Sequence, residues 1–342
     1  MCTCKIIPED VIARFAHDED LSAELRAHFK NTLAIEPAWR EVREVQAQLH
    51  AFATMSLSAH PVVAAAPAVT VYDCHHGVSL PGAPVPNPGS SSDPTAKRTF
   101  VETTAVAKFY KDVFGRNSVN GNGMTLQSSI HYGVKYNNAF WNGSQMTYGD
   151  GDGSIFVDFT LGNDVIGHEL THGVTQFTAQ LAYANQPGGL NESMSDCFGS
   201  MFRQWQAGQT VAKADWLIGH DILGPQAKAK GFTCLRNMAN PADPHALSPQ
   251  PTQFKQYHDG MDPHQSSGIP NFAFHKAAMA VGGKSWEKVG QVWYKALTGY
   301  APAPQLTMKA FADRTRTEAQ KLFPGAPAVK KAVDDAWKAV GL

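Results

Sequence analysis

The segment at residues 165–172 constrains this chain more than any other stretch, because it places two histidines four residues apart with a glutamate after the first. On a helix, residues four apart lie on one face, so His168 and His172 can bind one metal ion together. Glu169 between them can then act on a metal-bound water. The alternative is a buried amphipathic helix whose histidines make ordinary hydrogen bonds, and these residues alone leave it open.

The composition of the 342-residue chain fits two folded domains with a short extra segment. Hydrophobic residues make up 43% of the chain and charged residues 17%, which is enough apolar material for packed cores. The formal net charge of −1 gives no electrostatic basis for binding nucleic acid or an anionic membrane. The sequence also lacks a run of about 18 apolar residues that could span a bilayer. We therefore expect neither partner, and we expect a monomer.

The N-terminus lacks an apolar core of signal-peptide length and becomes acidic at Glu9 and Asp10. This predicts a cytoplasmic protein, or one exported by a non-classical route. The cysteines are few, scattered and odd in number, which argues against a disulfide framework and fits a reducing compartment. They are Cys2, Cys4, Cys74, Cys197 and Cys234.

The hydrophobic pattern predicts an α+β fold divided into four parts. They are a helical leader at 1–52, a linker with an activation cleavage site at 53–68, a β-rich domain with the metal-binding helix at 69–181, and an α-helical domain at 182–342. In the leader, Val11, Ile12 and Phe15 make one apolar face, and Pro37 can open a further helix.

Shorter patterns predict individual elements. Strands are expected at 69–73 and 78–80, on either side of His75 and His76. These adjacent histidines admit a metal site, but a turn is the better interpretation. A further strand is expected at 155–159. Helices are predicted at 99–114 with Gly115 as its end, 163–179, 190–207, 271–281, 285–297, 307–322 and 327–339.

Two histidines leave a catalytic zinc one protein ligand short, because such sites use three ligands and an open fourth position. Glu192 lies 20 residues after His172, a spacing that lets a second helix pack on the first and supply a carboxylate. Asp196, one turn further on, can accept the remaining ring N–H of a ligand histidine. The alternative for both residues is an ordinary acidic helix N-terminus.

Several stretches together resemble the thermolysin family of zinc endopeptidases. They are HELTHGVT at 168–175, GLNESMSD at 189–196, NNAFWNG at 137–143 and YGDGDG at 148–153. The resemblance runs from about residue 70 to the C-terminus, and the short leader resembles the precursor of the protealysin-like branch. It implies a two-domain metalloprotease with zinc bound by His168, His172 and Glu192, and Asp196 behind them.

The resemblance also implies the catalytic roles. Glu169 would move the proton from the zinc-bound water to the leaving amine. His264 and Tyr183 would stabilise the developing oxyanion, and Asp259 would orient His264. Substrate backbone would bind Asn138, Ala139 and Arg236, and the pocket for the residue after the scissile bond would be lined by Phe156, Phe159, Val165 and Leu235. These four are apolar, so we expect cleavage before Leu, Phe, Ile or Val.

Calcium binding is doubtful. The family's double calcium site would fall at positions where this chain has Arg203, Leu217 and His220 in place of acidic residues, although Asp164, Asp215 and Asp221 remain. A guanidinium opposes Ca²⁺ directly. We therefore expect this double site to be lost, with Arg203 paired to Asp164 or Asp215.

The resulting expectation is a zinc endopeptidase acting on peptides and proteins, made as a precursor that its own leader inhibits until the linker is cut autocatalytically. Two other classes stay open: a non-catalytic peptide-binding module, and an oligomeric protein that uses zinc for stability alone. A narrower hypothesis brings the Cys2 or Cys4 thiolate to the zinc; the alternative is that residues 5–8 pack on the rim of the cleft.

Overall fold

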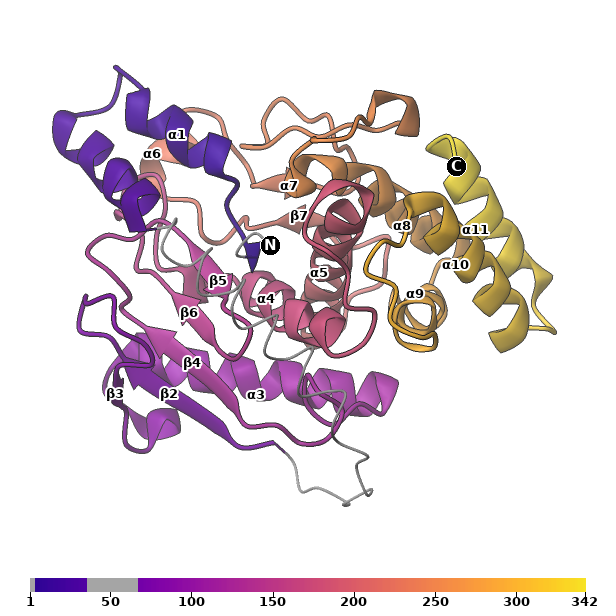
Figure 1. Ribbon diagram of the computed structural model, residues 1–342, viewed down its shortest axis with the longest axis horizontal. Helices are drawn as coiled ribbons and strands as arrows, with labels where there is room; N and C mark the ends of the chain where they lie inside the picture. The colour runs from indigo at the N-terminus through magenta and orange to yellow at the C-terminus, as the bar shows by residue number, and fades with distance from the viewer. Residues whose placement is uncertain (1–3, 36–66) are drawn as a thin grey trace.

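The computed structural model describes residues 4–35 and 67–342, and its first domain is built on a mixed sheet (Figure 1). The strand order is β1-β5-β6-β4-β2-β3, with β2–β4 and β4–β6 parallel and the other pairs antiparallel. The strands are β1 (Cys4–Lys5), β2 (Val69–Asp73), β3 (Ala83–Pro84), β4 (Leu126–Ile130), β5 (Ala139–Trp141) and β6 (Met146–Tyr148). The leader therefore supplies the edge strand next to β5.

One long helix, α3 (Pro94–Phe114), lies along the sheet and contacts β2 and β4. It begins earlier than the predicted 99–114, because Asp93 accepts hydrogen bonds from the amides of Thr95 and Ala96 and Pro94 suits the first turn. Gly115 ends it in the left-handed conformation with φ 69°, as expected.

The two helices that meet at the centre of the molecule are α4 (Asn163–Gln176) and α5 (Asn185–Gln206). They approach closely at Gly167 and Gly199. A Cβ on Gly199 would lie 2.5 Å from the carbonyl oxygen of Asp164, so only glycine permits this separation. The close contact brings the first turns of α5 alongside the histidines of α4. The predicted helices at 163–179 and 190–207 are confirmed, with shifted ends.

The rest of the chain consists of loops and helices, and its last four helices lie on the side of α5 away from the sheet (Figure 1). Its elements are β7 (Leu217–Ile218), α6 (Pro225–Ala229), β8 (Arg236–Asn237), α7 (Pro263–Ser266), α8 (Gly268–Val281), α9 (Val289–Thr298), α10 (Met308–Leu322) and α11 (Pro327–Ala339). The predicted division into a β-containing first domain and a helical last third is confirmed. Among the described helices, none combines the length and the apolar character that crossing a bilayer requires.

The leader folds over one side of the sheet domain, in indigo in Figure 1. Helix α1 (Glu9–His17) buries the predicted face of Val11, Ile12 and Phe15, and residues 23–35 form a second helix that buries Phe29. The helix predicted after Pro37 and most of the predicted linker lie outside the described residues.

Two predicted strands are corrected. Residues 78–80 are not a strand; the strand that pairs with β2 is β3, after Pro81, which lacks the N–H that a sheet ladder needs. The segment 155–159 makes only an isolated bridge between Phe156 and Leu223. Asp158 then accepts a hydrogen bond from the amide of Thr160 and begins a 3-10 turn. His75 and His76 form the predicted turn, with φ of 48° and 61°.

Candidate metal centre and active site

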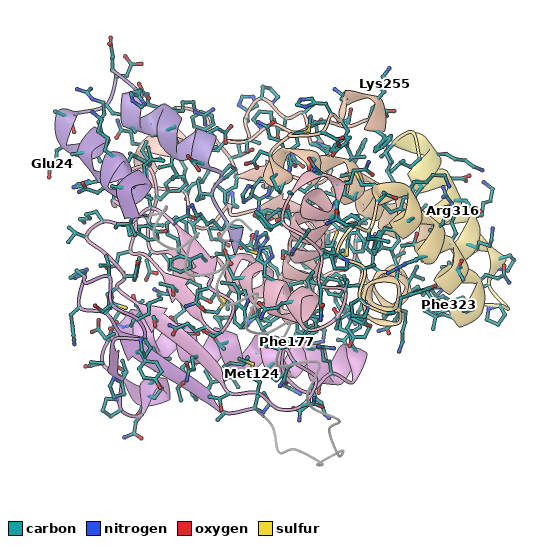
Figure 2. The ribbon with its side chains drawn as sticks, in the orientation of Figure 1. Glu24, Met124, Phe177, Lys255, Arg316 and Phe323 are labelled. Carbon is teal, nitrogen blue, oxygen red and sulfur yellow. The ribbon has the colours of Figure 1, made fainter. Side chains whose placement is uncertain are left out.

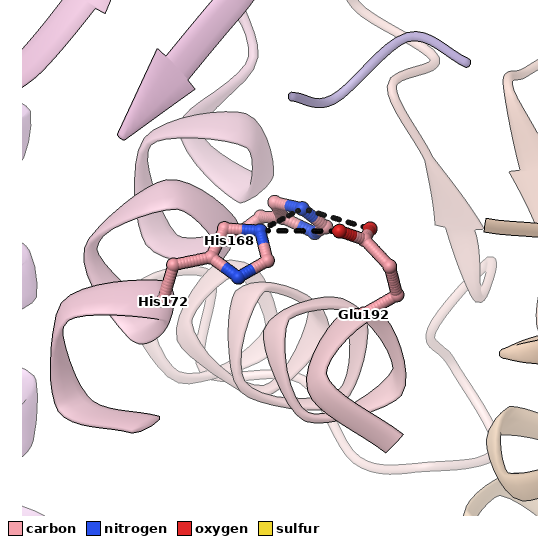
Figure 3. Close-up of side chains that lie close together, drawn as sticks. All are labelled: His168, His172 and Glu192. Atoms are coloured by element: carbon pink, nitrogen blue, oxygen red, sulfur yellow. Dashed lines mark hydrogen bonds and ion pairs between the residues drawn. The ribbon is translucent and has the colours of Figure 1, made fainter. Parts of the chain in front are cut away.

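Three side chains from α4 and α5 converge on one point (Figure 3). The Nε2 atoms of His168 and His172 lie 3.1 Å apart. Each lies 3.4 Å from a different carboxylate oxygen of Glu192. The i, i+4 spacing places both rings on one face of α4, and the packing of α5 supplies the carboxylate. All three residues are buried.

A second set of side chains fixes the orientation of both rings. His168 Nδ1 lies 2.9 Å from Asp196 Oδ1, as predicted. His172 Nδ1 lies 2.9 Å from Asn191 Oδ1 and 3.0 Å from Ser195 Oγ, and neither of these residues was predicted. Asn191 precedes Glu192 on α5 and Ser195 follows it. The helix that supplies the third ligand therefore also orients the ring of the second ligand, His172. Such partners fix the ring tautomer and raise ligand basicity.

The donor set fits a zinc ion. With Nδ1 of each ring donating to an oxygen, the two Nε2 atoms face each other with lone pairs, and a cation between them removes the repulsion. Glu192 Oε2 is buried and has no hydrogen-bond donor among the described residues. Two imidazoles and a carboxylate are a typical catalytic zinc set. No fourth His, Cys, Asp or Glu joins this group within the described residues, so the fourth position is open.

Three further side chains were predicted to act at the open position. Glu169 follows the first ligand on α4 and is fully buried. The hydroxyl of Tyr183 donates to Glu192 Oε1 and lies 3.3 Å from Nε2 of His264. Burial opposes charge on His264, but the carboxylates of Glu192 and Asp262 outweigh it and raise the pKa of the ring to about 9. The protonated ring of His264 can therefore donate a hydrogen bond to an oxygen in the open position, and Tyr183 can do the same when its hydroxyl turns away from Glu192.

The orienting partner of His264 is Asp262, which corrects the prediction of Asp259. Asp262 Oδ1 lies 2.8 Å from Nδ1 of His264 and also accepts from its backbone amide. Asp259 is exposed and accepts from the hydroxyl of Tyr257. The reason is local: Asp262 is the N-cap of α7, so its side chain turns back over the residue two positions on.

Arg236 and Asp196 form a bidentate ion pair with no exposed surface on either side chain. Burial alone would raise the pKa of the Asp196 carboxyl, but Arg236 and His168 lower it to about 2. Asn271, which was not predicted, donates to Oδ2 of the same carboxylate at 2.9 Å. No local sequence pattern indicates Asn271, because it lies 75 residues further along the chain.

The predicted substrate-backbone residues all bind the leader. Ile6 donates from its amide to the carbonyl of Ala139, and its own carbonyl accepts from Nη1 of Arg236. Ile7 exchanges two hydrogen bonds with the side-chain amide of Asn138. The four predicted pocket residues, Phe156, Phe159, Val165 and Leu235, have no exposed surface.

Arg203 makes an ion pair with Asp215 at 3.1 Å and a second with Asp221 at 3.4 Å. The predicted partners of Arg203 were Asp164 and Asp215, and the ion pair with Asp215 is confirmed. His220 lies with Nδ1 2.7 Å from the carbonyl of Thr233, and Leu217 is in β7.

Fold and site together define a metallopeptidase: a three-ligand open zinc site with an adjacent glutamate, beside a sheet edge that binds an extended peptide. A family model described as the thermolysin metallopeptidase catalytic domain matches residues 85–176, and one described as its alpha-helical domain matches residues 179–342. The chain belongs to the thermolysin family of zinc metalloendopeptidases.

Relatives agree with this assignment. An extracellular metalloprotease of Pectobacterium carotovorum subsp. carotovorum is 40% identical over 284 residues, 80% of each chain. A thermolysin of Bacillus sp. (strain EA1) is 37% identical over 288 residues, 80% of this chain and 51% of that one. The solved precursor of protealysin from Serratia proteamaculans has 35% identity and a TM-score of 0.83, and the match covers 99% of each chain.

Proposed function

We propose that this chain is the precursor of an endopeptidase that its own leader inhibits, and that the enzyme cuts on the N-terminal side of bulky hydrophobic residues. One observation carries the proposal: residues 4–7 lie along β5 and occupy the backbone positions that a substrate needs. A substrate cannot pair with β5 while β1 does.

The leader has further contacts beyond those of residues 4–7. The rings of Phe15 and Phe29 pack on Phe156, with centroids 6.3 and 6.2 Å away. Lys230 makes an ion pair with Asp18 at 3.2 Å, and Nη2 of Arg14 donates to the carbonyl of Leu247. These contacts span both catalytic domains, so the leader adds apolar burial and ion pairs to the few hydrogen bonds of β1.

The chemistry follows from the positions of the side chains. Zinc, when bound by His168, His172 and Glu192, supplies Lewis-acid polarisation of the peptide carbonyl and lowers the pKa of water towards ~7. Glu169 takes a proton from that water and passes it to the leaving amine, which contributes ~10²–10⁴-fold. His264 and Tyr183 donate hydrogen bonds to the carbonyl oxygen as negative charge develops on it.

The preference for hydrophobic residues is supported by the character of the residues proposed to line the pocket next to the scissile position. These residues, Phe156, Phe159, Val165 and Leu235, are apolar and have no exposed surface. A charged side chain there would lose its water without gaining a partner, whereas each buried CH₂ contributes about 0.8 kcal/mol.

The test compares turnover of a quenched hydrophobic peptide by the full chain before and after limited proteolysis of the linker. We expect turnover to rise on cleavage and to disappear with a zinc chelator. Phe15→Ala should raise turnover by the uncut chain, because it loosens the leader. Phe323→Ala is the matched control, because this residue lies far from the leader (Figure 2). Equal turnover by both uncut variants and the unchanged chain would refute leader inhibition.

We also propose that the double calcium site is empty. Support comes from Arg203, whose guanidinium contacts Asp215 and Asp221 at the place where Ca²⁺ would need anionic oxygen.

A further inference from the structure

One peptide bond of the leader, between Lys5 and Ile6, lies at the open position of the metal centre. The carbonyl oxygen of Lys5 accepts a hydrogen bond from Nε2 of His264 at 2.6 Å. The same Nε2 lies 3.6 Å from Glu192 Oε2 and 3.3 Å from the hydroxyl of Tyr183. The indigo N-terminal segment passes beside the three metal ligands in Figure 3. The Lys5 carbonyl is therefore where the carbonyl of a bond about to be hydrolysed must lie.

The residues on the C-terminal side of this bond fix its register. Ile6 donates to the carbonyl of Ala139 at 3.2 Å and accepts from Arg236 at 2.9 Å. Ile7 donates to Asn138 Oδ1 at 3.0 Å and accepts from Asn138 Nδ2 at 3.2 Å. A shift by one residue would break all four of these hydrogen bonds and turn Ile6 to the other side of the strand.

The side chains agree with this register. Ile6 is fully buried, and it is the residue directly after the bond, where the proposed specificity requires a bulky apolar side chain. The peptide binds antiparallel to β5, with Cys4 opposite Trp141 and Lys5 opposite Phe140. The segment thus has the backbone contacts and the side chain of a substrate.

We infer that the Lys5–Ile6 bond is a processing site of this chain, cut by the chain's own active site. The inference rests on the proposed function and adds the position of a cut, five residues from the N-terminus and well before the linker. In this reaction the oxygen of one water molecule bonds to the carbonyl carbon of Lys5, and the C–N bond to Ile6 breaks. One water proton passes through Glu169 to the Ile6 nitrogen. The products are a carboxylate on Lys5 and an amine on Ile6, which is protonated at neutral pH.

The test is mass spectrometry of the intact zinc-loaded full chain over time. We expect a species that lacks residues 1–5 and begins at Ile6. Its rate of formation should not change on 100-fold dilution, because the bond and the site belong to one molecule. Glu169→Gln should retain all five residues. A rate proportional to protein concentration would overturn the intramolecular assignment.

Two variants test the register. Ile6→Asp places a carboxylate in the apolar pocket and should slow the cut at least tenfold, whereas Val134→Asp, an equal change at an exposed site, should leave the rate unchanged. Hydrogen exchange on the metal-free chain gives a readout that needs no turnover. The amides of Ile6 and Ile7 should be protected in the unchanged chain, and Asn138→Ala should release protection at Ile7. Free exchange at both amides in the unchanged chain would overturn the inference.

The outcomes separate this inference from the proposed function. If the processed enzyme hydrolyses the quenched peptide while the precursor retains residues 1–5, the proposed function stands and the processing site is wrong. If neither the peptide nor the Lys5–Ile6 bond is cut by a zinc-loaded preparation, both fail.

Discussion

Arg236 and Asp196 connect the metal centre to the peptide-binding edge through one buried ion pair. Nε and Nη2 of Arg236 each lie 2.8 Å from a different oxygen of Asp196. Asp196 also bonds the ring of His168, and Nη1 of Arg236 donates to the carbonyl of Ile6. The residue that orients a metal ligand and the residue that binds the peptide are therefore partners. A change in either one should affect both metal binding and peptide binding.

Asp196→Ala should weaken zinc binding about 10- to 100-fold, because His168 loses the acceptor that fixes its tautomer. It should also cost about 3–5 kcal/mol of stability, because Arg236 is left buried without its counter-ion. Chelator competition measures the first effect and urea unfolding the second. Adding Arg236→Met to the variant should recover part of the stability but not the zinc affinity. Unchanged zinc affinity in Asp196→Ala would contradict the role assigned to this carboxylate.

Glu169→Gln should lower kcat for the quenched peptide by at least ~10²–10⁴-fold, because the amide cannot accept the proton of the attacking water. Zinc content and thermal stability should not fall, since Glu169 is not among the three ligands. Mass spectrometry under native conditions counts the bound zinc in the same samples. Glu24→Gln, an exposed change in the leader, is the control and should retain the activity of the unchanged chain (Figure 2). Loss of zinc from Glu169→Gln would indicate a ligand role instead.

Asp262→Asn should reduce kcat/KM more than Asp259→Asn. Burial alone would raise the pKa of the Asp262 carboxyl, but His264 outweighs it and lowers that pKa, so the two residues stabilise each other's charge. Asparagine in place of Asp262 removes this stabilisation, and the alkaline limb of the kcat/KM profile should move to lower pH. Asp259 contacts Tyr257 on the surface, so its asparagine variant should keep the unchanged profile. The reverse order of effects would restore Asp259 as the orienting residue.

The parts of this site that could be predicted from sequence are those set by local geometry. His168 and His172 depend only on the helical repeat, and the Glu192–Asp196 spacing is one helical turn. The resemblance to a known family then assigned residues such as Tyr183. It also placed the orienting aspartate five residues before His264, at Asp259, whereas the structure places Asp262 beside the ring. The Asp-Pro pair at the start of α7 is a helix N-cap pattern and could have indicated Asp262.

Other features depend on contacts between distant parts of the chain. The pairing of Ile7 with Asn138 joins residues 131 apart, and nothing in the leader's sequence specifies which of its bonds reaches the metal centre. The orienting contacts of Asn191 and Asn271 depend on how three helices pack. The prediction of a strand at 78–80 was wrong for a simpler reason. The hydrophobic alternation is present, but Pro81 follows it directly and has no N–H to donate.

Calcium should change the stability of this protein little. Added Ca²⁺ at millimolar concentration should shift the thermal midpoint of the zinc-loaded chain by less than about 2 °C, because Arg203 already neutralises Asp215 and Asp221. Arg203→Glu removes the guanidinium and adds a carboxylate, so it should gain a calcium-dependent shift. Differential scanning calorimetry with and without Ca²⁺ measures both. A large shift in the unchanged chain would show that the site binds calcium.

The last prediction concerns a charged cluster on the sheet domain, away from the metal centre. His131 lies between two carboxylates: Nδ1 is 2.8 Å from Asp150, and Nε2 is 2.9 Å from Asp93. His76 also faces Asp150, at 3.4 Å. The hydrogen bond to Asp150, opposed by burial and aided by Asp93, raises the pKa of His131 to about 9 from the usual 6.5.

A pKa that is higher in the folded state means that folding favours the protonated ring. The stabilisation is complete below pH 6.5 and is lost as pH rises towards 9. The shift corresponds to at most about 3 kcal/mol, and the partial exposure of Asp93 and Asp150 reduces our expectation to about 1–2 kcal/mol. Urea unfolding of the Glu169→Gln chain, which cannot digest itself, should show this decline. His131→Gln should flatten it, while His258→Gln, at an exposed position, should not. Free transition metals must be removed, because ligand atoms of Asp73, Asp93 and His131 lie within 4.8 Å of one another. Stability that is constant from pH 6.5 to 9 would show that His131 is neutral in the folded protein.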